Sequence, residues 1–237
     1  MIPDSRIQWL EHSSADTWAD AIAADIQAAL AADLTAHGRA RALLSGGTTP
    51  APAYARLAQA PLDWAAVEFG LVDDRFVPAD HAASNTRLIR ESLLERTVGA
   101  TFQPLVHEGL SAADSVAVAN RTAAAAQPAC VAVLGMGNDG HTASLFPGSV
   151  DLDRALASDA DYAVLDATGC PVAAEWTTRI TLTGAGLARC RQHLLLLRGQ
   201  SKREVLEAAL SGDDVREMPI RAVLNLGGSP LRVHWCA

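Results

Sequence analysis

The stretch GMGNDGHTAS, from Gly135 to Ser144, combines an open backbone with side chains that can move a proton. It ends a predicted strand at 130–135, and its three glycines within six residues leave room for a ligand. His141 could act as a base near neutral pH, while Asp139 could hold the loop and orient the imidazole. The other six histidines have no such setting, and none is spaced from another like a metal ligand. The pattern predicts a catalytic histidine and no metal site.

A second glycine-bearing turn, SGGTTP at 45–50, follows the strand predicted at 41–45. Gly46 and Gly47 permit a positive φ and a close approach of another molecule to the main chain, and Thr48 lies in the same turn. The turn lacks both the lysine of a P-loop and the glycine spacing of a dinucleotide-binding fingerprint. The turn therefore matches neither of these two nucleotide-binding motifs.

The end of this turn predicts the start of a helix. Thr49 can cap the helix with its side chain, and Pro50 suits the first helical position. The unpaired amides at such a start attract anions. A tight strand-to-helix turn without any ligand is the alternative interpretation of these residues.

A third polar cluster, Asp73, Asp74 and Arg75, also follows an apolar run. Adjacent carboxylates beside a guanidinium could handle protons or orient hydroxyl groups. Ser84 or Asn85 is expected to cap the helix that comes next. A solvated ion pair in a loop is the alternative.

Two cations further along the chain are candidates for binding a phosphate. Ser201 and Glu204 match the S-x-x-E capping box, which would place Lys202 in the first turn of a helix. A cation there opposes the helix dipole, and this is understandable if the helix start faces a phosphate. Arg179, at the start of an earlier strand, could add a bidentate contact. The alternative is a solvent-facing lysine and a surface arginine.

The elements that must position these residues alternate along the chain. The β-rich runs are 41–45, 67–72, 130–135, 162–167, 179–183, 193–198 and 231–236. The helical candidates are 50–60, 85–96, 111–126 and 201–211. Continuous apolar strands covered by helices predict a mostly parallel sheet in an α/β fold, with ligands at the carboxyl ends of the strands. No linker or repeat divides the chain, so a single domain over 1–237 is expected, and the last run could be an edge or a buried strand.

An amphipathic helix is predicted from Ser14 to His37, with Ser13 or Ser14 as its cap and Gly38 closing it. Its apolar residues recur every four positions, at Trp18, Ile22, Ile26, Leu30 and Leu34. The predicted helix therefore buries one stripe.

Composition limits the classes of function. The 237 residues are 49% hydrophobic, which is ample for a core, and 19 basic against 27 acidic side chains give a net charge of −8. Broad attraction to nucleic acid or an anionic membrane is therefore not expected. The sequence shows neither a signal peptide nor a long apolar run, so the cytoplasm is predicted. The four cysteines lie far apart without a CxxC pattern and are expected to be reduced.

Taken together, these loops resemble the 6-phosphogluconolactonase family, which is related to the glucosamine-6-phosphate deaminases. The resemblance covers roughly 41–236. The matching motifs are SGGTTP at 45–50, DDR and SN at 73–75 and 84–85, GMGNDGHTASLFPG at 135–148, and Arg179 with Lys202. The resemblance implies a modified Rossmann-like sheet flanked by helices and hydrolysis of 6-phospho-D-glucono-1,5-lactone in the oxidative pentose phosphate pathway, without metal or organic cofactor.

The resemblance also implies roles for the candidate residues. The loop carrying Gly46, Gly47 and Thr48 would hold the 6-phosphate of the substrate, together with Arg179 and Lys202. The bare backbone of the loop would let its amides reach the phosphate oxygens.

The remaining candidates would act nearer the lactone. His141 would take a proton from the water that attacks the carbonyl, with Asp139 fixing its loop. Arg75 would stabilise charge or orient the substrate. Asp73 would contact sugar hydroxyls, and Asn85 is expected among the substrate-binding residues.

Two rival functions remain open. A deaminating isomerase on the same scaffold would carry an acid five residues beyond His141, where this chain has Phe146, and Asp-Glu-Tyr in place of the residues at 73–75. A non-enzymatic sugar-phosphate sensor would usually need a DNA-reading module, and no basic helix-turn-helix pattern is present. Both sets of differences favour the lactonase.

Overall fold

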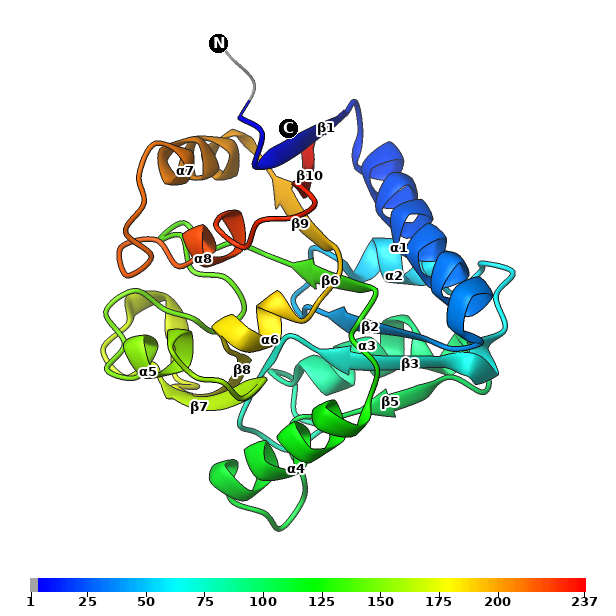
Figure 1. The fold of residues 1–237 in the computed structure, drawn as a ribbon, viewed down its shortest axis with the longest axis horizontal. Coiled ribbons are helices and arrows are strands. Elements are labelled where there is room, and N and C mark those ends of the chain that lie inside the picture. Colours follow the sequence, from blue (N-terminus) through cyan, green and yellow to red (C-terminus); the bar gives the residue numbers. More distant parts are fainter. Residues whose placement is uncertain (1–3) are drawn as a thin grey trace.

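The computed structural model describes residues 4–237 and contains two sheets (Figure 1). The large sheet consists of β1 (Ile7–His12), β2 (Ala40–Leu44), β3 (Val67–Leu71), β5 (Thr101–Gln103), β6 (Val131–Leu134), β9 (His193–Arg198) and β10 (Leu231–Cys236). Every strand pair in it is parallel, in the order β1-β10-β9-β6-β2-β3-β5. The predicted parallel α/β sheet is confirmed.

The strands in the middle of this sheet are covered on both faces. All residues of β2 and β6 are buried, as are Leu194 to Leu197 of β9. Such burial explains why β6 and the segment Leu194 to Leu197 of β9 are continuous apolar runs rather than alternating ones, whereas β2 also contains the buried Arg41. β10 lies between β1 and β9, so the final apolar run is an internal strand.

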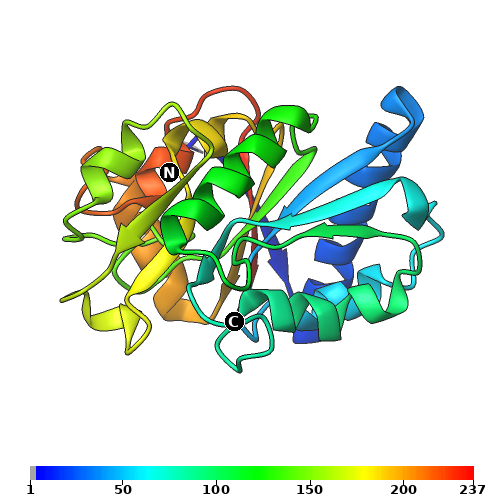
Figure 2. The same ribbon diagram turned by 90° about the horizontal axis from the view of Figure 1, so that it is seen from below.

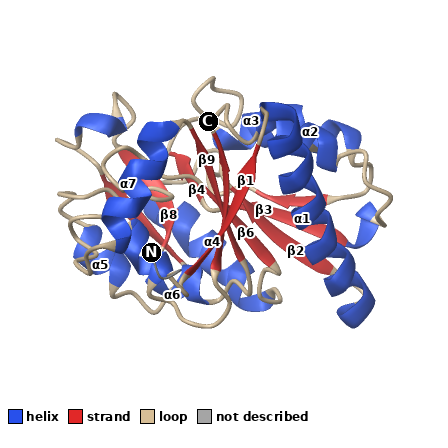
Figure 3. Cartoon of the chain, turned by 90° about the horizontal axis from the view of Figure 1, so that it is seen from above, coloured by secondary structure: helices blue, strands red, loops and turns tan. Residues whose placement is uncertain are grey.

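The helices connect the strands and cover the sheet. They are α1 (Ala15–His37), α2 (Ala51–Leu57), α3 (Asn85–Ser92), α4 (Ala112–Ala125), α5 (Leu152–Leu156), α6 (Gly184–Ala188), α7 (Gln200–Leu210) and α8 (Ile220–Leu224). Short 3₁₀ turns are η1 (Trp64–Ala66), η2 (Leu94–Arg96) and η3 (Pro171–Ala173). Figure 3 shows the strands between α1 and α2 on one side and α5 and α7 on the other. No described helix is long and apolar enough to cross a bilayer.

Helix α1 confirms the prediction from periodicity. Ser14 caps it by accepting a hydrogen bond from the Thr17 amide, and Gly38 ends it at φ 70°. Trp18, Ile22, Ile26 and Leu30 are buried, and Leu34 is partly buried against the core. A stripe of this kind stabilises the fold by about 2 kcal/mol per fully buried side chain.

A second, antiparallel sheet was not expected. It consists of β4 (Asp73–Arg75), β8 (Thr178–Leu182) and β7 (Tyr162–Asp166), in the order β4-β8-β7. In Figure 2, which views the molecule from below, β7 and β8 lie to one side of the large sheet. Residues 73–75 were expected at the end of the strand predicted at 67–72, but they form a separate strand, β4, because they pair with β8, more than a hundred residues away. Strands β1 and β5 and helices α5, α6 and α8 were also missed.

Candidate active site

Most of the chemically interesting residues meet at one place. A cavity of about 290 Å³ opens beyond the carboxyl ends of β2, β3 and β6, where ligands of parallel sheets bind. Its walls include predicted site residues from all four loops: Gly46, Gly47, Asp73, Arg75, Asn85, His141 and Lys202. Figure 1 shows β9, β6, β2 and β3 as neighbours in the large sheet, although they lie far apart in the chain.

The loop after β6 holds His141 beside Asp139. The Asp139 Oδ1 atom lies 2.6 Å from His141 Nδ1 and also accepts the His141 amide at 3.2 Å. Burial raises the pKa of Asp139, but the hydrogen bond and charge of His141 outweigh it, and the net pKa lies below its usual value. With Nδ1–H donating to Asp139, Nε2 is the unprotonated nitrogen and can accept a proton.

This arrangement depends on a glycine at position 137. The Gly137 amide donates to the His141 carbonyl and closes the turn. A Cβ atom built on Gly137 would lie 2.1 Å from His141 Nδ1 and 2.3 Å from Asp139 Oδ1. Only glycine leaves the space that the histidine and the aspartate occupy.

The ring of Phe146 packs against the imidazole of His141. The phenyl ring, 2% exposed, lies 4.6 Å from that of His141, measured between centroids. The guanidinium carbon of Arg179 lies 5.4 Å from the same phenyl centroid. An apolar ring thus occupies the position where the rival deaminase would carry its acid.

The turn after β2 provides main-chain donors. The amides of Gly46, Gly47 and Thr48 donate to no acceptor within residues 4–237. Gly47 has φ 86°, and a Cβ atom on Gly46 would lie 1.8 Å from Asn85 Oδ1, so neither position accommodates a larger residue easily. These free amides can bind an anion.

Two details of this turn differ from prediction. Thr49 does not cap the helix, because α2 begins one residue later, with Pro50 in the cap position and no side-chain cap. Thr48 is exposed and is not part of the cavity wall. Only its amide, not its side chain, remains a candidate for binding.

Lys202 lies in the first turn of α7, as predicted, but the capping box is wrong. Gly199, at φ 87°, occupies the cap position without a side-chain bond, and Gln200 donates to Glu204 instead. The Lys202 ammonium donates to the Met136 carbonyl at 2.7 Å and lines the cavity. Burial lowers the pKa of Lys202, and the negative charge of Asp139 partly opposes this.

The two neighbouring carboxylates have different environments. Asp74 is fully buried and accepts hydrogen bonds from the amides of Asn85 and Thr86, at 2.7 and 3.2 Å, and from the Thr86 hydroxyl. It therefore anchors the start of α3, and burial raises its pKa to about 6. Asp73, 8% exposed, faces the cavity instead.

Arg75 lines the cavity and has an unpaired donor. Its Nη1 donates to the Ala83 carbonyl at 2.7 Å. Its Nε is buried and has no hydrogen-bond partner in the described chain. A buried donor of this kind is costly unless a ligand supplies an acceptor, so the atom is a candidate for binding substrate oxygen.

Arg179 does not join the cavity wall. Its Nε donates to the Trp176 carbonyl at 2.6 Å and its Nη2 to that of Ala173 at 2.8 Å. Arg179 is only 5% exposed, and these two buried hydrogen bonds hold the loop after β7 in place. The expected direct phosphate contact has no support in this geometry, because two of the donor nitrogens are already engaged.

The structure also adds residues that the sequence analysis did not name as site residues. Ser45, Gly135, Met136, Gly137 and Ala143 complete the cavity wall. Each lies within or next to a motif that was recognised, so adjacency was the only available signal. Among residues 4–237, no group of three or more His, Cys, Asp or Glu residues could hold a metal ion. The four cysteines are free and buried, as predicted.

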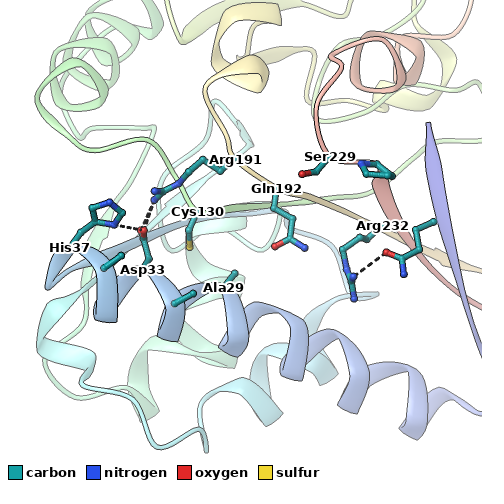
Figure 4. A pocket seen from close by; sticks show the side chains of 12 residues that line it. Ala29, Asp33, His37, Cys130, Arg191, Gln192, Ser229 and Arg232 are labelled. Carbon is teal, nitrogen blue, oxygen red and sulfur yellow. Dashed lines mark hydrogen bonds and ion pairs between the residues drawn. The ribbon is translucent and has the colours of Figure 1, made fainter. Parts of the chain in front are cut away.

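A larger hollow lies at the opposite end of the large sheet (Figure 4). It measures about 620 Å³ and lies where β6, β9 and β10 begin, against α1. Asp33 there is bound by His37 and Arg191, and Arg232 donates to Gln8. None of the predicted site residues reaches this hollow, so size alone does not identify the active site.

Comparison with known proteins identifies the family. The family model for glucosamine-6-phosphate isomerases/6-phosphogluconolactonase matches residues 13–235. A 6-phosphogluconolactonase of Xylella fastidiosa is 48% identical, covering 99% of this chain and 98% of the relative, and one of Rhizobium meliloti is 41% identical, covering 92% and 93%. This chain belongs to that family.

Solved structures agree with the predicted fold. A 6-phosphogluconolactonase from Shewanella baltica superposes with a TM-score of 0.91 at 36% identity, covering 98% of both chains. A monomeric glucosamine-6-phosphate deaminase superposes with a TM-score of 0.77 at 15% identity, covering 97% of each chain, and shows a shared fold alone. The modified Rossmann-like class is confirmed.

Proposed function

We propose that this protein is a 6-phosphogluconolactonase, hydrolysing 6-phospho-D-glucono-1,5-lactone to 6-phosphogluconate in the oxidative pentose phosphate pathway. The observation that carries the proposal is the convergence of the His141 imidazole, free amides and two cations on one cavity. The family and the names of its close relatives support the same reaction.

The phosphate would bind at the end of the cavity formed by the turn after β2. The free amides of Gly46, Gly47 and Thr48 would donate to its oxygens, and the Lys202 ammonium would add a positive charge. Arg179 would act indirectly, by holding the loop after β7. In this assignment the phosphate binds the unpaired amides of the turn and the ammonium group of Lys202, which makes one hydrogen bond and has three N–H donors.

The reaction itself needs a base and a stabilised oxyanion. His141 Nε2 would take a proton from a water as the water oxygen attacks the lactone carbonyl. Asp139 would stabilise the imidazolium that forms, through its bond to Nδ1. The unpaired Arg75 Nε would stabilise the negative carbonyl oxygen, and the imidazolium would return its proton to the ring oxygen as the ring opens.

Asp73 and Asn85 would face the sugar hydroxyls. The side-chain nitrogen of Asn85, Nδ2, donates to the main-chain carbonyl of Asp73 at 2.8 Å, so the two residues form one polar wall. No step in this scheme requires a metal or an organic cofactor. The small phosphosugar is the expected partner, since the net charge of −8 offers little attraction to nucleic acid or an anionic membrane, and the cytoplasm is the expected compartment.

Hydrolysis of freshly prepared lactone, corrected for spontaneous opening, tests the proposal. Wild type should accelerate ring opening, and His141→Ala should lose about 10² to 10⁴ of that acceleration while still binding 6-phosphogluconate in calorimetry. An inert wild type would reject the lactonase. Release of ammonia from glucosamine 6-phosphate by the same preparation would instead support the deaminase, although this chain has Phe146 where a deaminase would carry an acid.

A further inference from the structure

Ser144 is a buried polar residue to which the proposed mechanism assigns no role. It lies three residues after His141, and its side chain is completely inaccessible to solvent. Its hydroxyl donates to Asp73 Oδ2 at 2.5 Å, a distance typical of a charge-assisted hydrogen bond from a hydroxyl to a carboxylate. The serine thus joins the loop of the proposed base to the carboxylate that faces the sugar.

The backbone of Ser144 is held equally firmly. Its amide donates at 3.1 Å to the hydroxyl of Thr181, which lies on β8 and is itself fully buried. Thr181 is directly opposite Asp73 in the β4–β8 pairing. Both ends of the Ser144 to Asp73 contact are therefore fixed by the small antiparallel sheet.

The second contact of the Asp73 side chain is much weaker. Asn85 Nδ2 lies 3.4 Å from Asp73 Oδ1, while the same nitrogen donates to the Asp73 carbonyl at 2.8 Å. Ser144 therefore occupies Oδ2, and Oδ1 keeps most of its capacity to accept hydrogen bonds. Since Asp73 lines the cavity, Oδ1 is available to a hydroxyl donor bound there.

We propose that Ser144 is a positioning residue: by binding Asp73 Oδ2, it aims Oδ1 at a hydroxyl group of the sugar ring. The inference rests on the proposed function for the identity of the sugar. It also gives the sheet that contains β4 and β8 a role in substrate recognition. That sheet sets the distance between the loop that carries His141 and the carboxylate of Asp73.

The effect should appear mainly in substrate binding. A hydroxyl contact exists in the bound substrate as well as in the transition state, so its loss raises KM more than it lowers kcat. Removing a hydrogen bond to a charged group typically changes affinity by about tenfold or more. We expect Ser144→Ala to raise KM by about tenfold and kcat to fall by less than about threefold.

A double-mutant cycle distinguishes positioning from a merely structural role. If Ser144 acts through Asp73, then Ser144→Ala should change KM little in a chain that already carries Asp73→Ala. Ser144→Thr, which keeps the hydroxyl, should recover much of the wild-type KM. Ser149→Ala is the matched control, since Ser149 is also buried and donates to a backbone carbonyl, that of Asp166, outside the cavity. It should lower the melting temperature without changing KM.

The cycle is measured twice, with lactone hydrolysis and with calorimetric binding of 6-phosphogluconate, after thermal unfolding has shown that each variant folds. Equal, additive losses from Ser144→Ala with and without Asp73 would overturn the inference while leaving the lactonase intact. An inert wild type that still binds 6-phosphogluconate with a coupled cycle would overturn the lactonase and keep the positioning role. A wild type that neither hydrolyses nor binds would overturn both.

Discussion

Replacing Gly137 with alanine should impair catalysis while leaving the fold intact. The added carbon would lie 2.1 Å from His141 Nδ1 and 2.3 Å from Asp139 Oδ1, far inside van der Waals contact. Relieving both overlaps requires the two side chains to move by about 1 Å, and a displacement of that size near reacting atoms costs about 10² in rate. Gly137→Ala should therefore lower kcat/KM for the lactone by about 10².

Stability should change little in the same variant. Gly137 does not have a positive φ, so an alanine can adopt its backbone conformation, and the loss of flexibility in the unfolded chain favours folding slightly. Thermal unfolding and calorimetric binding of 6-phosphogluconate should therefore stay close to wild type. Together with the kinetic assay, they separate a displaced base from a damaged protein.

Two further variants sharpen the test. Gly135→Ala lies in the same loop, but its added methyl meets no atom within 4 Å, and its kcat should fall by less than about threefold. Gly137→Ala combined with His141→Ala should be no slower than His141→Ala alone. An unchanged kcat in Gly137→Ala, or full additivity in the double variant, would refute the reasoning that this glycine acts through the imidazole.

Three other outcomes follow from the site. Asp139→Asn should reduce kcat by about 10², since the amide cannot stabilise an imidazolium, and steady-state kinetics would contradict this if only KM changed. Lys202→Gln should raise KM for the phosphorylated lactone by about tenfold or more but should leave KM for unphosphorylated gluconolactone unchanged; equal effects on both would remove Lys202 from the phosphate site. Burial raises the pKa of Asp74 from 3.8 to about 6, so the stability tied to its protonated form is complete below about pH 4 and is lost as pH rises through 6. Denaturation of wild type and Asp74→Asn should diverge by about 3 kcal/mol across that window, and a constant difference would show that Asp74 has an ordinary pKa.

Much of the fold could be predicted because its signals are local. The four-residue spacing in α1 and the continuous apolar runs of β6 and β9 depend only on neighbouring residues and on burial. Strand β1 was missed because its sequence, IQWLEH, is neither a continuous apolar run nor a strict alternation. It is an edge strand, and its conformation depends on pairing with β10, more than two hundred residues away. The capping box at Ser201 failed because α7 begins at Gln200, with Gly199, at a positive φ, in the cap position two residues before Ser201.

The candidate site likewise contains residues that could be predicted from the sequence and one whose environment could not. The sequence revealed the glycines of the two loops and a histidine two residues after an aspartate. These were recognisable because backbone freedom and acid–base chemistry follow from the type of residue alone. The position of Arg179 was not recognisable, since the carbonyl groups that bind it come from a loop whose path depends on the whole chain.

The sequence by itself determined which side chains stand at the strand ends, and the tertiary structure decided what each one faces. Asp73 and Asp74 are chemically identical neighbours, yet one lines the cavity and the other is buried beneath α3. Successive residues of an extended strand point to opposite faces, so pairing with β8 directs one carboxylate to the cavity and the other to the helix. That choice depends on a strand more than a hundred residues away, and no local pattern contains it.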